Sequence, residues 1–325
     1  MQNRKGLRPL TEGALLAAVT AVLVLAGFYL PVVGGLIIFL WPVPVVVVYL
    51  RHGLRTALMT VLVAGVAVGL FVGPLQAIGL VANFGLMGLA LGVGFARQRS
   101  PLVALVMATG AFVVSGAISL LMGVLVAGIA PSELWAQVEA GMRGALDVYR
   151  SLGLGAEQLA KMESFMDRML EGMRLMLPAG IVGGALFSAF INFEVARLVL
   201  RRLGWTIQPI PPFAAWRIPR AMLVVLLLGV GCVAAGDWQG RQALYVAGVN
   251  LQVLAQMAYA VGGLSLAYYY LQRWGVQKAF RILILAYVCF VPLLAQLASL
   301  AGMADSLLDF RQRTQAVQEV PERRG

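Results

Sequence analysis

The chain has 325 residues, of which 61% are hydrophobic and 12% are charged, and its mean hydropathy is +0.87. Long apolar runs of this kind are typical of a polytopic membrane protein and exclude ordinary soluble domains. The formal net charge of +11 does not indicate nucleic-acid binding, because the basic residues fall in short clusters between apolar runs, as topology-setting loop charges do.

The apolar runs predict an all-α fold, because a chain that crosses lipid as single segments must satisfy its backbone hydrogen bonds within helices. A span needs about 20 apolar residues, and on this basis we expect a polytopic transmembrane helical bundle with about nine spans. The first run is too long for a signal peptide and lacks a cleavage site, so we expect it to stay as the first helix. The predicted spans cover residues 12–31, 34–50, 56–72, 75–95, 102–130, 176–197, 220–236, 243–271 and 279–303.

The first span contains two overlapping Ala-x-x-x-Ala pairs on adjacent faces. Ala14 pairs with Ala18, and Ala17 pairs with Ala21. Small residues four positions apart let another helix approach closely, and in lipid this close packing drives helix association. The pairs therefore indicate either docking of a partner helix or packing within the chain's own bundle.

Residues 131–177 form the one long stretch that cannot lie in lipid. A single acid, Glu12, precedes this stretch, which itself contains seven acidic and five basic residues. Its apolar residues follow helical spacing in two runs separated by Gly153 and Gly155, so we predict a water-facing amphipathic helical hairpin. The second run has a methionine seam, interpreted as packing rather than as soft-metal ligation because no His or Cys lies alongside. This seam comprises Met162, Met166, Met169 and Met173.

The loop charges predict the orientation of the spans. Lys and Arg gather in the N-terminus and in alternate loops, whereas the short loops on the other side hold only Arg241. By the positive-inside rule, the N-terminus is expected in the cytoplasm, with the hairpin on the outer side of the membrane. The tail, Asp305 to Gly325, would be outside with nine spans, but inside if Pro292 breaks the last span into a re-entrant pair. Its balanced charges do not decide between the two.

The segment 198–219 differs from the other predicted cytoplasmic loops in its proline and tryptophan content. Prolines prevent a continuous helix, and tryptophan prefers the membrane interface, so we predict an extended link along the membrane surface. The link separates a six-helix membrane core with the hairpin, residues 1–203, from a C-terminal three-helix bundle and tail, residues 204–325. The residues that indicate it are Trp205, Pro209, Pro211, Pro212 and Trp216.

No pattern in the sequence indicates an enzyme. It contains no HExxH motif, no Cys/His cluster, no Gly-x-Ser-x-Gly elbow and no phosphate-binding loop. The lone histidine, His52, lies between Arg51 and Arg55 in a predicted turn and is interpreted as an ordinary loop residue. We therefore expect no catalytic residue, no cofactor and no metal, and any energy for transport would come from a partner or an ion gradient.

Polar residues inside the spans are the best candidates for a binding site, because each costs free energy unless it is paired or functional. Glu194 has Arg197 three residues on, which predicts an interfacial ion pair. Four amides have two interpretations, contact with a small-molecule ligand or helix–helix hydrogen bonds of roughly 0.6–2 kcal/mol each. These amides are Asn83, Asn192, Asn250 and Gln252.

The opening segment LTEGALLAAVTAVL resembles the first helix of S components, the substrate-binding subunits of energy-coupling-factor (ECF) vitamin importers. The resemblance extends over roughly residues 9–202. It implies that Ala14, Ala17, Ala18 and Ala21 pack on a transmembrane coupling subunit that works with ATPases. It also implies a substrate site near the outer surface, under loops that here include the hairpin as a lid. The enlarged hairpin and the further spans after residue 203 depart from the S-component pattern.

Two further segments, FLWPVPVVVVYLRHGLRTAL at 39–58 and AGMADSLLDFRQR at 301–313, resemble the YybS-like family of uncharacterised bacterial membrane proteins. This resemblance covers nearly the whole chain and implies no particular activity. From the residues and both resemblances, we expect a lipid-embedded, multi-pass protein of the bacterial cytoplasmic (inner) membrane that binds a small molecule on the outer side for uptake. The alternative is a non-catalytic membrane scaffold that binds other proteins through the amphipathic hairpin and the cytoplasmic loops.

Overall fold

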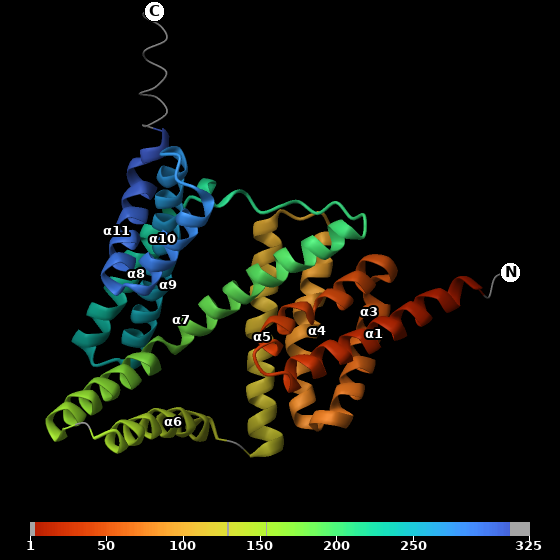
Figure 1. The fold of residues 1–325 in the computed structure, drawn as a ribbon, viewed down its shortest axis with the longest axis horizontal. Helices are drawn as coiled ribbons and strands as arrows, with labels where there is room; N and C mark the ends of the chain where they lie inside the picture. The colour runs from red at the N-terminus through yellow and green to blue at the C-terminus, as the bar shows by residue number, and fades with distance from the viewer. Residues whose placement is uncertain (1–3, 129, 154, 313–325) are drawn as a thin grey trace, which may run out of the picture. The chain divides into compact units, whose positions relative to one another are not determined.

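The computed structural model describes residues 4–128, 130–153 and 155–312, and all regular secondary structure within them is helical, which confirms the all-α prediction. Residues 313–325, which include most of the predicted tail, lie outside the described residues. The elements in Figure 1 are α1 (Arg4–Tyr29), α2 (Gly34–Ile37), η1 (Ile38–Leu40), α3 (Val43–Val72), α4 (Pro74–Ala96), α5 (Pro101–Ala127), α6 (Pro131–Ser151), α7 (Ala156–Arg202), η2 (Phe213–Ala215), α8 (Ala221–Gln239), α9 (Gln242–Arg273), α10 (Lys278–Phe290) and α11 (Pro292–Leu308).

Helices of membrane-spanning length dominate the chain. By length and composition, seven helical stretches of the described residues could cross a membrane, and the bent pair α10–α11 would make an eighth if it is one span. The polytopic helical architecture is therefore confirmed, but the count of about nine spans is not. The difference arises mainly because the predicted spans 34–50 and 56–72 fall within one stretch, Gly34–Val72.

A kink at Gly53 explains how one helix, α3, reads as two short spans in the sequence. Gly53 has φ +80° and ψ −176°, a backbone conformation that side chains with a Cβ atom rarely adopt. The helix therefore changes direction at the basic turn that contains Arg51 and Arg55. The arm after the kink, residues 54–72, is long enough for a span by itself, whereas the arm before it, residues 43–52, reaches that length only together with α2 and η1.

The last predicted span, 279–303, is broken in the structure. Val291 is extended, with φ −98° and ψ 109°, and the chain bends there by 106° between α10 and α11. Pro292 begins α11, and a proline disfavours helical conformation at the preceding residue while lacking an N–H of its own. The structure thus has the break at Pro292 that was left open by the sequence.

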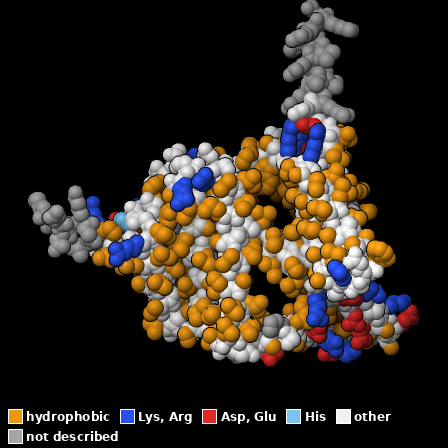
Figure 2. Space-filling view, turned by 180° about the vertical axis from the view of Figure 1, so that it is seen from behind, with side chains coloured by type: hydrophobic (Ala, Val, Ile, Leu, Met, Phe, Trp, Pro, Cys, Tyr) orange, Lys and Arg blue, Asp and Glu red, His pale blue; other side chains and the backbone are white. Residues whose placement is uncertain are grey.

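Both arms of the predicted hairpin are helical, and the second arm is continuous with the sixth predicted span. α7 has 47 residues, which corresponds to about 70 Å at 1.5 Å per residue, more than twice the hydrocarbon thickness. α6 precedes it across a turn where Gly153 has φ +81°. In Figure 2, acidic and basic side chains gather over this hairpin, whereas hydrophobic side chains cover most of the remaining visible surface. The side of the membrane on which the hairpin lies stays a prediction.

The chain divides into two compact units, which are described separately. The first comprises residues 1–170 and 184–210, and the second comprises residues 171–183 and 211–325. A segment in the middle of α7 therefore belongs with the C-terminal helices. The units do not test whether 1–203 and 204–325 are separate domains, which stays a prediction.

The first unit has two apolar cores. One joins α3, α4, α5 and the last part of α7 around Val46, Leu91 and Phe193, and the other joins α1, α3 and α4 around Val45 and Phe84. α4 approaches α3 closely because it carries glycines at the contact: a Cβ atom at Gly88 would lie 2.9 Å from Val45, and one at Gly92 would lie 2.8 Å from Tyr49. Close backbone approach of this kind is how helices associate in lipid.

In the second unit, α9 packs between α8 and α11. Gly263 and Gly302 leave no room for a Cβ atom where α9 and α11 cross. Ser299 contacts Gln256, and further along both segments Arg311 contacts Ser265. Later residues of α9 therefore lie beside later residues of the C-terminal segment, so α11 runs in the same direction as α9. Residues 309–312 therefore lie at the same end of this unit as the C-terminus of α9.

Candidate functional site

The two alanine pairs of α1 have different environments. Ala17 and Ala21 are 1% and 6% exposed, and Ala21 belongs to the core that α1 forms with α3 and α4. Ala14 and Ala18 are exposed. One pair therefore packs within the chain's own bundle, while the other forms a small-residue face on the surface of a candidate span.

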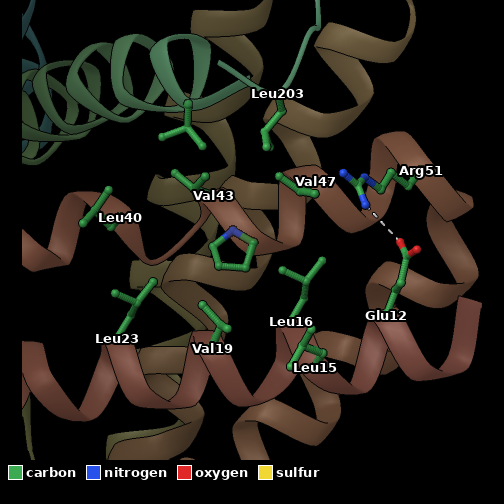
Figure 3. Close-up of a pocket in the computed structure, with 12 residues that line it drawn as sticks. Glu12, Leu15, Leu16, Val19, Leu23, Leu40, Val43, Val47, Arg51 and Leu203 are labelled. Atoms are coloured by element: carbon green, nitrogen blue, oxygen red, sulfur yellow. Dashed lines mark hydrogen bonds and ion pairs between the residues drawn. The ribbon is translucent and has the colours of Figure 1, made fainter. Parts of the chain in front are cut away.

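A groove of about 360 Å³ runs beside α1, between this helix, the first arm of α3 and the end of α7 (Figure 3). Its walls are apolar except at one end, where Glu12 and Arg51 form an ion pair. The lining residues are Glu12, Leu15, Leu16, Val19, Leu23, Leu40, Val43, Pro44, Val47, Arg51, Val199 and Leu203.

The charged end of this groove brings together three residues from two helices. Glu12 Oε2 accepts a hydrogen bond from Arg51 Nη1 at 3.2 Å and lies 2.9 Å from His52 Nε2. The sequence predicts an ordinary loop residue at His52 and indicates no partner for Glu12. The available signal was that Glu12 is the one acid before residue 133 and lies at the same predicted membrane boundary as the basic turn at 51–55.

Two of the four predicted ligand-binding amides lie in the first unit. Asn83 joins α4 to α5, because its Oδ1 accepts a hydrogen bond from Ser115 Oγ at 2.7 Å while its Nδ2 donates to Gly79 O. Asn192 on α7 is 4% exposed and donates to Ser188 O at 2.8 Å. Its Oδ1 has no hydrogen-bond partner among the described residues.

The other two amides lie on α9 in the second unit. Asn250 Oδ1 accepts a hydrogen bond from Ala179 N at 2.7 Å, and Asn250 Nδ2 donates to Leu175 O at 2.8 Å. These two backbone groups would bond each other in a regular α-helix, so the side chain bridges α7 beside Pro178. Gln252 lies against Gly229 of α8.

The structure therefore gives Asn83 and Asn250 the helix–helix role, one of the two interpretations of the sequence. None of the four amides lines the groove beside α1. Contact of these residues with a ligand stays a prediction.

The methionine seam of the hairpin is only partly covered. Met162 and Met166 are partly buried, whereas Met169 and Met173 are 45% and 44% exposed. The buried position in this part of α7 is Leu170, at 7%. The covered positions 162, 166 and 170 thus step by four residues and leave the predicted heptad seam after Met166.

A buried polar cluster in the second unit was not anticipated from the sequence. Arg311 is 2% exposed; it forms an ion pair with Asp305 at 3.3 Å, donates to Ser265 Oγ at 3.1 Å and donates to Ala214 O. Burial lowers the pKa of Arg311, and the charge of Asp305 opposes that shift. Nearby, Arg217 pairs with Asp309 at 2.8 Å. The cluster fixes residues 305–311 to the segment around η2.

The described residues contain no group of three or more His, Cys, Asp or Glu side chains that could hold a metal ion. The predicted ion pair on α7 is present, with Arg197 Nη2 2.6 Å from Glu194 Oε2.

Comparison with known proteins gives a family and one curated relative. Residues 18–306 match the family described as "Predicted membrane protein (DUF2232)". The uncharacterised protein YybS of Bacillus subtilis strain 168 is 24% identical over 285 residues, which cover 85% of this chain and 88% of that protein. No solved structure gives a significant match. The YybS-like resemblance is thereby confirmed, while the resemblance to S components stays a prediction.

Proposed function

The chain belongs to the DUF2232 family of membrane proteins, and for this multi-pass protein we propose a role as the non-catalytic subunit of an uptake system in the bacterial cytoplasmic membrane. In this role it binds a small molecule on the outer side and docks through α1 on a transmembrane coupling subunit. Partner ATPases supply the energy, since the sequence contains no phosphate-binding loop.

The observation that carries the proposal is the exposed small-residue face of α1. A transmembrane helix can bury one face in its own bundle and offer a second to a partner, and the second must be small for the backbones to approach closely. α1 has this division, with Ala17 and Ala21 buried and Ala14 and Ala18 exposed. The arrangement suits a subunit that completes its packing only within a larger assembly.

The hairpin supports the outward-facing part of the proposal. The loop charges favour a cytoplasmic N-terminus. Arg51, beside the kink at Gly53, pairs with Glu12 near the start of α1, so in this proposal each arm of the stretch Gly34–Val72 crosses the membrane. Five crossings before residue 131 then place α6 and the first part of α7 outside the cell. Their side chains are predominantly exposed and include acidic and basic residues, as expected for a cover in water rather than a span in lipid. The hairpin is then available to close over a ligand.

The α1 docking face can be tested with bulky substitutions. We expect Ala14→Trp and Ala18→Trp to abolish co-purification of a coupling subunit with its ATPases from native membranes, because a large side chain keeps the helices apart. Val66→Trp is the control, since Val66 is 69% exposed on another candidate span. Equal recovery of ATPases with all three variants would refute docking through α1. A panel of small molecules should stabilise the wild-type protein against heating, and lack of any stabilisation would refute ligand binding.

A second function, membrane scaffolding through the hairpin, is favoured by the apolar side chains that the hairpin leaves exposed. Val138 on α6 is 39% exposed, and Phe165 on α7 is 59% exposed. Leu134 and Leu152 on the same segment are also exposed, and an extended apolar surface in water marks a protein-interaction site. We expect Val138→Ser and Phe165→Ser to release a bound protein without changing solute uptake, whereas Gln137→Ser should have no effect. Loss of uptake together with partner release would contradict a pure scaffold.

A further inference from the structure

The groove beside α1 lies within the candidate membrane spans of the first unit. α1 and the stretch Gly34–Val72 both qualify as spans, and together they supply most of its lining. The groove opens at the surface along α1, where Leu15 is 66% exposed and Val19 is 40% exposed. In a bilayer this opening faces hydrocarbon, and its apolar walls offer water few hydrogen-bond partners. Something apolar therefore fills it.

The dimensions of the groove decide between a hydrocarbon chain and a helix. Its lining on α1 extends from Glu12 to Leu23, a rise of about 16 Å at 1.5 Å per residue. A helix with side chains is about 10 Å across, so a helix of that length has an envelope of roughly 1,300 Å³. The groove, at about 360 Å³, is too small to enclose it. One extended acyl chain fits.

The charged end of the groove holds one acid and one base, Glu12 and Arg51, so a preference for an anionic headgroup depends on the donors that Arg51 has left and on the basic residues beside the groove. Arg51 uses Nη1 for Glu12, its side chain is 42% exposed, and a guanidinium has further N–H donors that suit a phosphate. Leu203 projects into the groove between Val43 and Arg51 in Figure 3. Two exposed residues, Arg201 and Arg202, directly precede Leu203 in the sequence. Basic pockets between transmembrane helices bind anionic lipid headgroups.

We propose that this groove is a binding site for one anionic phospholipid, with an acyl chain lying along α1 between Val19 and Val47 and the phosphate held by Arg51. The site is separate from the Ala14–Ala18 face, because the groove is lined by residues on another side of α1. A bound lipid would fill the space between α1, α3 and α7 and so become part of the first unit's packing.

The experiment is native mass spectrometry of the full-length protein released from nanodiscs that contain equal amounts of phosphatidylglycerol and phosphatidylcholine. The wild-type protein should retain one phosphatidylglycerol in preference to phosphatidylcholine. Val19→Trp fills the groove and should lose this lipid, whereas Val66→Trp, on a lipid-exposed face outside the groove, should retain it. Arg51→Gln keeps the shape of the groove and should lower the preference for phosphatidylglycerol by about tenfold, as expected for loss of a charge-assisted hydrogen bond.

Two results would overturn the proposal. One is equal retention of the two lipids by the wild-type protein, and the other is equal lipid loss from Val19→Trp and Val66→Trp. A change of oligomeric mass with Val19→Trp, without a change in bound lipid, would assign the groove to a protein partner and also count against the site. Helix content by circular dichroism checks that each variant is folded, and the Arg51→Gln measurement stands independently if Val19→Trp fails to fold.

Discussion

Replacing Arg311 with methionine should destabilise the second unit more than any substitution of an exposed charge. The guanidinium is 2% exposed and interacts with Asp305, Ser265 Oγ and Ala214 O. Methionine retains much of the length of the side chain but neither the charge nor the donors. Asp305, with its side chain 7% exposed, would then be a buried carboxylate without its ion pair.

The expected magnitude follows from that unpaired acid. Removing one member of a buried ion pair costs about 3–5 kcal/mol, because the remaining charge is left desolvated. We expect the lower part of this range, about 3 kcal/mol, because Phe310 N still donates to Asp305 Oδ1 at 3.2 Å and remains as a hydrogen bond to the carboxylate. The double variant Arg311→Met with Asp305→Leu should cost less than the sum of the single variants, since it leaves neither charge unpaired.

The free energy of unfolding can be measured for the four proteins of this double-mutant cycle by titrating SDS into detergent micelles. Arg150→Met is the control: it breaks the exposed Arg150–Asp147 pair, whose side chains are 53% and 69% exposed, and should change stability by less than about 1 kcal/mol. Strictly additive effects of Arg311→Met and Asp305→Leu would refute the reasoning, because they would show that the two residues do not stabilise each other.

Three other predictions concern the backbone and topology. Gly53→Ala should destabilise the protein by about 1–3 kcal/mol through backbone strain at φ +80°. The control Gly35→Ala should be close to neutral in the same SDS titration, because its Cβ atom meets no atom within 4 Å and its φ is not positive. Equal losses of stability in the two variants would exclude strain as the cause. Asn250→Leu should cost about 1–2 kcal/mol, because it removes the bridge to Ala179 and Leu175, and hydrogen exchange at Ala179 should accelerate; unchanged exchange would contradict the bridge. The side of the tail can be tested by cysteine labelling in a protein without its native cysteines. Because α11 runs in the same direction as α9, a membrane-impermeant thiol reagent should label Gln312→Cys and Gln277→Cys from one side of the membrane and Gln239→Cys from the other. Labelling of Gln312→Cys and Gln277→Cys from opposite sides would refute the re-entrant arrangement.

The class of this protein could be determined from the sequence because lipid imposes a strict local rule. Apolar runs in lipid must satisfy their own backbone hydrogen bonds, so composition and run length predict helices without knowledge of their partners. The same local reasoning predicted helices in both arms of the hairpin from their periodicity, and the proline-rich link, whose residues 205–212 have no regular structure. Pro292 marked a candidate break in the last span.

Tertiary structure decided everything that depends on which helix lies beside which. The sequence shows two equivalent alanine pairs on α1, but only the fold buries Ala17 and Ala21 and leaves Ala14 and Ala18 exposed. Asn250 and Pro178 lie 72 positions apart in the chain, so no periodicity connects the amide to the helix that it bridges. Arg311 is likewise buried by groups that are distant in the sequence, from Ala214, Ser265 and Asp305, so no local pattern predicts its burial. The local sequence pattern determines the length and polarity of each helix. Contacts between residues far apart in the chain depend on how the helices pack, which only the folded structure shows.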